Sequence, residues 1–180
     1  MAPLEELALR TADGDEDAFA EIYATLVDPV YRYLYWNLYS REDAEDLAEE
    51  VFLKCLVNIS RYEPGRGPFK AWAFRIAHNL LVDHQRKRSR RGQEELKEGL
   101  VDGEATAAEG LEEAERARAL RESLEDLPSS QRQVIAMKYF SEMSNSEVAT
   151  ALGRSEGAVN ALQHRALRHL GKLLEERDWR

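Results

Sequence analysis

Five cationic side chains stand within six positions of one another in the stretch "DHQRKRSRR", which runs from Asp83 to Arg91. They are Arg86, Lys87, Arg88, Arg90 and Arg91. The chain of 180 residues has a formal net charge of −9 at pH 7, so this run is a local exception. Such a cluster suits a polyanion, because each cation can neutralise one phosphate. The alternative is that these cations merely keep a helix end soluble, since positive charge at the C-terminal end of a helix also suits the helix dipole.

Aromatic and polar groups precede the cations on the same predicted helix, "PFKAWAFRIAHNLLVDHQRKR". The aromatic residues are Phe69, Trp72 and Phe74, and the outer face carries Arg75, His78, Asn79 and Asp83. A single nucleic-acid strand requires this combination, because cations hold its backbone, rings stack on its bases, and amides or carboxylates bond unpaired base edges. Phe69 shares a stripe with Ile76 and Leu80, which favours burial of its ring, whereas burial and stacking both stay open for Trp72.

A second group of polar side chains lies near the end of the chain, in "SNSEVATALGRSEGAVNALQHRALRHLGKLLEE". Ser144 and Glu147 predict a capping box, Gly153 a helix stop, and Ser155 the cap of the next helix. The buried face of that helix would carry Val159, Leu162, Ala166, Leu170 and Leu173, and the opposite face Asn160, Gln163, His164, Arg165 and Arg168. This pattern suits a helix-turn-helix whose second helix reads a major groove. A plain helical hairpin with a solvated face is the alternative.

The elements that must position these groups are predicted to be helices throughout. An apolar stripe through Phe19, Ile22, Tyr23 and Leu26 predicts a helix that Asp28-Pro29 breaks and restarts. Ser40 and Asp43 open the next helix with a capping-box-like spacing, and its inner face comprises Ala44, Leu47, Ala48, Val51, Cys55 and Ile59. A loop, "RYEPGRG", leads to the basic helix at Pro68. Further helices are predicted from about 111 to 127, 129–140, 145–152 and 156–176.

Charge divides the chain into blocks. Residues 1–60 carry a net charge of −10, residues 61–91 of +7, residues 92–115 of −8 and residues 127–180 of +2. Residues 92–110 are rich in Gly, Ala and Glu and have too few large apolar side chains to offset the cost of ordering, which predicts a flexible acidic linker. The predicted fold class is therefore all-α, with two small helical domains, 1–91 and 111–180, joined by that linker.

Several classes of protein are disfavoured by composition. Cys55 is the single cysteine, so an internal disulfide and a cysteine-built zinc site are excluded. The start lacks a secretory signal, and no run approaches the roughly 18 apolar residues of a membrane span, so a cytoplasmic protein without cofactor or metal is expected. A helical metal hydrolase is the enzyme alternative, because His78, Asp83 and His84 stand close together in the sequence. The two histidines are six positions apart, however, and point to different faces.

Four stretches in this order resemble the extracytoplasmic-function (group IV) sigma factors of RNA polymerase: "DAEDLAEEVFLKCL", "PFKAWAFRIAHNLLVDHQRKR", "LEDLPSSQRQVIAMKYF" and "SNSEVATALGRSEGAVNALQHRALRHL". The resemblance implies that domain 1–91 is similar to sigma region 2, which binds the clamp helices of polymerase β′ and melts the −10 promoter element. Domain 111–180 would be similar to region 4, which binds the β flap and reads the −35 duplex. It also implies core polymerase, duplex and single-stranded promoter DNA, and an anti-sigma factor as partners, and no enzymatic activity.

The same resemblance implies roles for individual residues. The −10 element would be bound by Trp72, Arg75, Asn79, Asp83, Arg86, Lys87 and Arg88, with Arg86 to Arg88 on the backbone. The −35 element would be read by Arg154, Ser155, Gly157, Asn160, Gln163, His164 and Arg168, and polymerase bound by Asp43, Asp46, Glu49 and Glu50. The chain departs from the family pattern at Ala158, where Thr or Ser is frequent, and at Glu49 or Glu50, where Gln is common. An autonomous helix-turn-helix repressor is the alternative function, which would dimerise and would not need the groups from Trp72 to Asp83.

Overall fold

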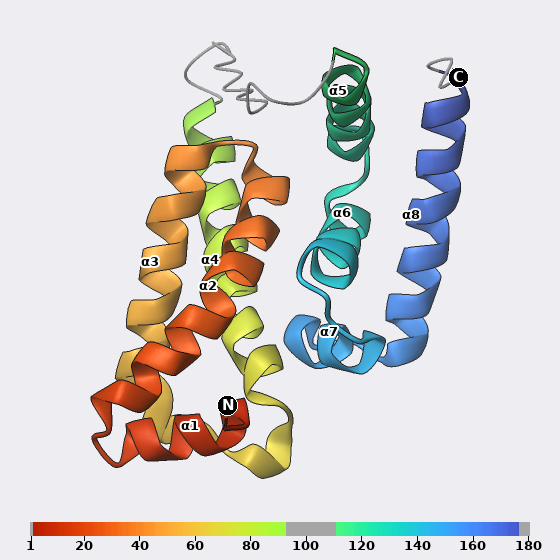
Figure 1. Ribbon diagram of the computed structural model, residues 1–180. Coiled ribbons are helices and arrows are strands. Elements are labelled where there is room, and N and C mark those ends of the chain that lie inside the picture. Colours follow the sequence, from red (N-terminus) through yellow and green to blue (C-terminus); the bar gives the residue numbers. More distant parts are fainter. Residues whose placement is uncertain (1, 93–110, 177–180) are drawn as a thin grey trace.

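The computed structural model describes residues 2–92 and 111–176, and this part of the chain is helical without strands. The first module contains α1 (Leu4–Ala12), α2 (Glu16–Leu38), α3 (Arg41–Asn58) and α4 (Phe69–Gly92). The second contains α5 (Leu111–Glu125), α6 (Ser129–Ile135), the π-helical turn η3 (Ala136–Phe140), α7 (Asn145–Leu152) and α8 (Glu156–Glu176). The two modules lie side by side (Figure 1). The predicted all-α fold is confirmed, whereas the predicted linker, 92–110, lies outside the described residues except for Gly92.

Helix α2 runs through Pro29 without a break, so the predicted interruption at Asp28-Pro29 is wrong. An internal proline costs a helix about 3 kcal/mol, because it lacks an N–H group and its ring meets the preceding turn. Buried side chains on both sides of Pro29 explain why the helix tolerates it. Leu26 and Val30 flank the proline, and Ile22 and Leu34 continue the same stripe into the core. Burying such side chains stabilises the fold by about 1.5–3 kcal/mol each, which outweighs the cost of the proline.

Helix α3 begins and packs as the sequence predicts. The Ser40 hydroxyl accepts a hydrogen bond from the backbone N–H of Asp43 at 3.2 Å. Every residue of the predicted inner face is buried, and Phe52 joins them. The connection from α3 to α4 contains two short 3-10 turns, η1 (Ile59–Arg61) and η2 (Pro64–Arg66). These turns bring the start of α4 back beside the end of α3.

Helix α1 was not predicted from the sequence, although Leu4, Leu7, Ala8 and Thr11 follow a helical spacing. Leu7 and Ala8 are buried. A carboxylate oxygen of Glu5 accepts a hydrogen bond from the backbone N–H of Phe69 at 3.0 Å. Because the first N–H groups of a helix have no partner within it, this contact caps α4 from a distant part of the sequence. Helix α1 therefore supports the start of the basic helix.

The helix-turn-helix of the second module forms as predicted. Ser144 and Glu147 make a complete capping box at the start of α7. At its end Gly153 has φ of 63°, in the left-handed region. The backbone N–H of Arg154 donates to the carbonyl of Ala149 at 2.9 Å, and that of Gly153 to the carbonyl of Thr150 at 3.4 Å. These two bonds make a Schellman motif, which turns the chain towards α8.

Replacing Gly153 with alanine is expected to lower the free energy of unfolding by about 1 kcal/mol, because a Cβ atom is unfavourable at positive φ. Asparagine at the same position should restore part of the loss. Chemical denaturation monitored by circular dichroism measures both changes. The matched control is Gly171→Ala in α8, where the glycine has ordinary helical φ and an added Cβ meets nothing within 4 Å. This control should be neutral or stabilising by up to about 1 kcal/mol.

Candidate nucleic-acid interface

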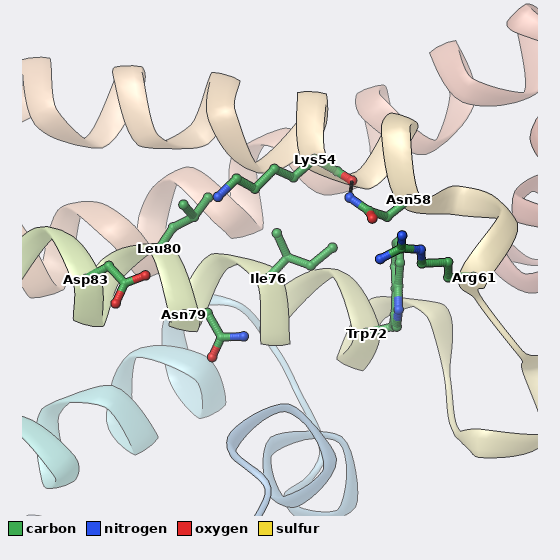
Figure 2. A pocket seen from close by; sticks show the side chains of 8 residues that line it. All are labelled: Lys54, Asn58, Arg61, Trp72, Ile76, Asn79, Leu80 and Asp83. Atoms are coloured by element: carbon green, nitrogen blue, oxygen red, sulfur yellow. Dashed lines mark hydrogen bonds between the residues drawn. The ribbon is translucent and has the colours of Figure 1, made fainter.

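A cavity of about 280 Å³ opens between α3, η1 and α4 (Figure 2). Its lining comprises Lys54, Asn58, Arg61, Trp72, Ile76, Asn79, Leu80 and Asp83. Three of the residues predicted to contact single-stranded DNA, Trp72, Asn79 and Asp83, therefore line one pocket. Lys54, Asn58 and Arg61 were not predicted, because only the packing of α3 and η1 against α4 brings them opposite Trp72 and Asn79. An indole face, an amide, a carboxylate and two cations around a small cavity suit one base with its phosphate.

Trp72 is held at the edge of the core by two other aromatic rings. The ring centroids of Phe69 and Trp72 are 5.3 Å apart, and those of Tyr62 and Trp72 are 5.8 Å apart. The Tyr62 hydroxyl donates a hydrogen bond to the carbonyl of Gly67 at 3.1 Å. Phe69 is fully buried, as predicted, while Trp72 is half-buried and lines the cavity. One side of the indole thus packs on the core and the other remains accessible.

Phe74 is 0% exposed, so the prediction that groups it with base-stacking rings is wrong. Its ring lies 5.7 Å from that of Tyr33 in α2. A helix has 3.6 residues per turn, so a residue two positions after Trp72 points to a different side of α4. That side is covered by α2, which the local pattern of the sequence does not show.

The cationic end of α4 remains available to solvent. Arg86, Lys87, Arg88 and Arg90 are exposed. Arg86 lies 3.9 Å from the carboxylate of Asp83, and a guanidinium nitrogen of Arg88 lies 3.7 Å from the carboxylate of Asp43. Exposed ion pairs of this kind contribute at most about 1 kcal/mol, so a phosphate can displace them. The described side chains of this run therefore keep their capacity to bind a polyanion.

The histidines of the first module have structural partners rather than a shared site. The Nδ1 atom of His78 lies 3.1 Å from the Tyr33 hydroxyl, and burial lowers the pKa of His78, with a smaller contribution from Arg154. The Nε2 atom of His84 lies 3.6 Å from the carboxylate of Asp43. Residues 2–90 and 118–175 contain no group of three or more side chains that could hold a metal ion. Within the described residues, the two histidines thus contact different groups and do not share a site.

The outer face of α8 presents most of the residues predicted to read duplex DNA. Arg154, Ser155, Gly157, Asn160, His164 and Arg168 are exposed, and Gln163 is half-buried. Ser155 caps α8 by accepting a hydrogen bond from the backbone N–H of Ala158 at 3.2 Å. The amide of Asn145 donates to the side-chain oxygens of both Asn160 and Gln163. The amide of Gln163 in turn donates to the hydroxyl of Tyr139 at 2.9 Å, so the side chains of Asn160 and Gln163 are both held in a defined orientation.

The exposed face of α3 combines acidic and apolar side chains. Asp46, Glu49 and Glu50 are exposed, whereas Asp43 is half-buried against α4. Sequence reasoning missed three large apolar residues beside them, Leu53, Leu56 and Val57, with exposed fractions of 62%, 43% and 71%. Their spacing of three and four positions was a visible signal, because it continues one face of α3 opposite its buried stripe. An exposed apolar stripe of this kind is typical of a protein-binding surface.

Both modules match the models of known protein families. Residues 22–91 match the family model for sigma-70 region 2, and residues 117–170 match that for sigma-70 region 4. The chain is 33% identical to the ECF RNA polymerase sigma factor SigW of Bacillus subtilis, over 91% of this chain and 92% of the relative. It is also 33% identical to the ECF sigma factor BldN of Streptomyces coelicolor, over 97% of this chain and 67% of the relative.

Solved structures share the fold. The chain aligns with CnrH, solved in complex with the cytosolic domain of CnrY, with a TM-score of 0.72 and 25% identity over 94% of this chain and 96% of CnrH. It also aligns with the sigma factor RpoE of Bartonella quintana, solved with the anti-sigma factor NepR, with a TM-score of 0.75 and 23% identity over 87% of this chain and 96% of RpoE. In the described residues no helix is both long and apolar enough to span a membrane. The chain therefore belongs to the ECF RNA polymerase sigma factors, which are not enzymes but transcription initiation factors that bind RNA polymerase and promoter DNA.

Proposed function

We propose that this sigma factor opens promoters by capturing a base of the non-template −10 strand in the cavity between α3 and α4. The observation that carries this proposal is the lining of the cavity, where Trp72 offers a ring face and Asn79 and Asp83 offer hydrogen-bonding groups. At about 280 Å³ the cavity is near the small end of ligand sites, which start at about 300 Å³, and this size suits a single base. Arg61 adds positive charge to the lining, as does Lys54, whose ammonium also lies 3.2 Å from the carboxylate of Glu50.

Strand opening then follows from differential binding. Unstacking a base costs a few kcal/mol, and stacking on an aromatic side chain returns about 1–3 kcal/mol per base. Arg75 and the exposed cations Arg86, Lys87 and Arg88 hold the backbone of the same strand. Because these contacts require an unpaired strand, they favour the melted promoter over the duplex.

The second module recognises the sequence of the promoter. The N-terminal half of α8 enters the major groove of the −35 element, where the amides of Asn160 and Gln163 contact base edges. Arg154 and Arg168 hold phosphates, and Ser155, Gly157 and His164 complete the contact face. The preset amides support this role, because their contacts with Asn145 and Tyr139 reduce the entropy lost on binding.

Polymerase binding is assigned to the exposed face of α3. Asp46, Glu49 and Glu50 provide charge for the β′ clamp helices, and the neighbouring apolar stripe provides buried area. Asp43 contributes from the start of the helix. Residues 1–91 thus act as the region 2 domain, 111–180 as the region 4 domain that also binds the β flap, and 92–110 as the linker. An anti-sigma factor is a further proposed partner, since the similar proteins CnrH and RpoE were solved in complexes with CnrY and NepR.

Reconstitution tests the proposed function. The purified chain is mixed with bacterial core polymerase and a library of promoter sequences, and transcript starts are sequenced. Initiation should occur at a defined subset of sequences that share −35 and −10 elements, at levels far above core enzyme alone. Start sites that are no different from those of core enzyme would contradict the proposal.

A further inference from the structure

Four polar side chains of the second module form one hydrogen-bonded network, the amide network, which comprises Tyr139, Asn145, Asn160 and Gln163. The amide nitrogen of Asn145 donates to Oδ1 of Asn160 and to Oε1 of Gln163, the second at 3.1 Å. Nε2 of Gln163 donates to the hydroxyl of Tyr139 at 2.9 Å. Tyr139 lies in η3, Asn145 begins α7, and the other two residues lie on α8. The amide network therefore ties the helix that is proposed to read DNA to two elements that precede it.

Asn145 is held on a rigid element. It is the first residue of α7, and the capping box of Ser144 and Glu147 fixes the backbone at this point. Val148 of α7 and Val159 of α8 are both fully buried in the same apolar cluster. Figure 1 shows α7 beside the first turns of α8. The position of the Asn145 amide relative to α8 is therefore set by packing within the second module.

The direction of these hydrogen bonds determines which groups face outward. The side-chain amide of Asn or Gln carries an acceptor oxygen on one side and two N–H donors on the other. Because the oxygens of Asn160 and Gln163 both turn towards Asn145, the nitrogen of Asn160, an exposed residue, turns outward. Gln163 keeps one N–H group besides the one that bonds Tyr139. The outer face of the amide network therefore offers hydrogen-bond donors.

The reversed network is less favourable. If all three amides turned over, Oδ1 of Asn145 would accept both bonds, and the two N–H groups of Asn145 would lose their partners. In the direction described, Oδ1 of Asn145 is instead buried without a hydrogen-bond partner among the residues that the structure describes. Buried N–H groups without a partner are rarer in proteins than buried oxygens without one. A buried polar atom left unpaired is also a poor means of stabilising a fold, which favours a role for Asn145 in reading DNA.

We propose that Asn145 is a positioning residue that sets which bases the −35 reader selects, by turning the N–H donors of Asn160 and Gln163 towards the major groove. This inference rests on the proposed function, in which these two amides contact base edges. In the major groove guanine presents two acceptors, N7 and O6, and thymine presents O4, whereas cytosine and adenine present amino groups that are donors. Outward donors therefore select guanine or thymine at the two contacted positions. Tyr139 has the same positioning role for Gln163 alone.

The variant Asn145→Asp should reverse this preference with almost no change in shape. A carboxylate only accepts, so the nitrogens of Asn160 and Gln163 must turn inward to it, and the Tyr139 hydroxyl then donates to Oε1 of Gln163. The amide oxygens now face outward and accept from the amino groups of adenine or cytosine. An acidic residue in the first turn of a helix is favourable, so the fold should be retained. The added negative charge should weaken binding to all sequences alike, which leaves the relative preference among bases as the readout.

Selection from a DNA library measures the preference. The full chain, assembled with core polymerase, binds duplex promoters that have a randomised −35 element and a fixed −10 element from a promoter found by reconstitution, and the bound DNA is sequenced. Asn160→Ala and Gln163→Ala first identify the two contacted positions, because each variant should lose selectivity at one of them. At these positions the wild type should prefer guanine or thymine about tenfold, and Asn145→Asp should prefer adenine or cytosine.

Two further variants and a control separate positioning from a structural role. Asn145→Ala should relax the base preference at both positions and Tyr139→Phe at the Gln163 position alone, while the melting temperatures measured by circular dichroism stay close to that of the wild type. Ser146→Ala, which removes an exposed hydroxyl of α7 outside the amide network, is the matched control and should leave the preference unchanged. Variants Asn145→Ala and Asn145→Asp that bind all −35 sequences more weakly but keep the wild-type preference would overturn the proposal.

The wild-type result separates this inference from the proposed function. A wild-type protein that prefers adenine or cytosine at the two positions would overturn the positioning role described for Asn145 but leave −35 reading intact. A wild-type protein that directs initiation yet selects no −35 sequence would contradict −35 reading itself, and the role of Asn145 with it.

Discussion

Replacing Asn79 with alanine is expected to slow formation of the open complex about tenfold, which corresponds to about 1.4 kcal/mol in the transition state. The amide lines the cavity beside Trp72. In the proposed function, its loss removes hydrogen bonds that form only when a base has left the duplex. Binding to the closed duplex promoter should change little, because the substitution leaves the proposed −35 contacts of α8 in place. Stopped-flow fluorescence of a probe in the −10 element measures opening, and filter binding at fixed salt measures the closed complex.

Two comparisons separate base capture from a general loss of structure. On a promoter that is already unpaired across the −10 element, Asn79→Ala should reduce open-complex formation less, because the sigma factor no longer has to separate the strands. Gln85→Ala is the matched control on the same helix, since that amide donates to the carbonyl of Asn37 rather than lining the cavity. Equal losses on paired and pre-opened templates would contradict the assigned role of Asn79.

Replacing Phe74 with alanine is expected to lower the free energy of unfolding by about 3–5 kcal/mol, a large part of the roughly 5–15 kcal/mol that stabilises a typical domain. The ring is 0% exposed and packs on Tyr33, so its removal leaves a cavity between α2 and α4. At about 2–4 °C per kcal/mol, the melting temperature should fall by roughly 6–20 °C. Chemical and thermal denaturation followed by circular dichroism provide the measurement.

Trp72→Ala is the informative partner of this variant, because the indole is half-buried and lines the cavity. Trp72→Ala should lower the free energy of unfolding less than Phe74→Ala does. It should slow promoter opening more. Phe74→Leu should recover most of the lost stability, since leucine refills much of the volume. A Phe74→Ala protein that melts like wild type but binds single-stranded DNA poorly would reverse the assignment and make Phe74 the stacking ring.

The sequence predicted most helices and both clusters of DNA-binding candidates, because the signals for these are local. Ser40, Ser144 and Gly153 stand next to the helix ends that they cap, and short apolar periods mark the buried stripes of α3 and α8. The prediction failed where distant packing outweighed a local signal. Pro29 lies inside α2 because the core holds the helix on both sides of it, and Phe74 is buried because α2 covers its side of α4.

The amino-acid sequence by itself determined the all-helical fold and the two modules, because helical periodicity, capping residues and blocks of charge are properties of neighbouring positions. The family followed from the resemblance of four continuous stretches of the chain. Only the tertiary structure decided which side chains share a cavity and which surfaces meet. Lys54 and Asn58 join Trp72 and Asn79 because α3 packs beside α4, and Arg61 joins them from η1 at the end of α3. Lys70 and Arg75 donate hydrogen bonds to the carbonyls of Ser141 and Thr150, which are 71 and 75 positions away in the sequence. No local pattern can specify such partners.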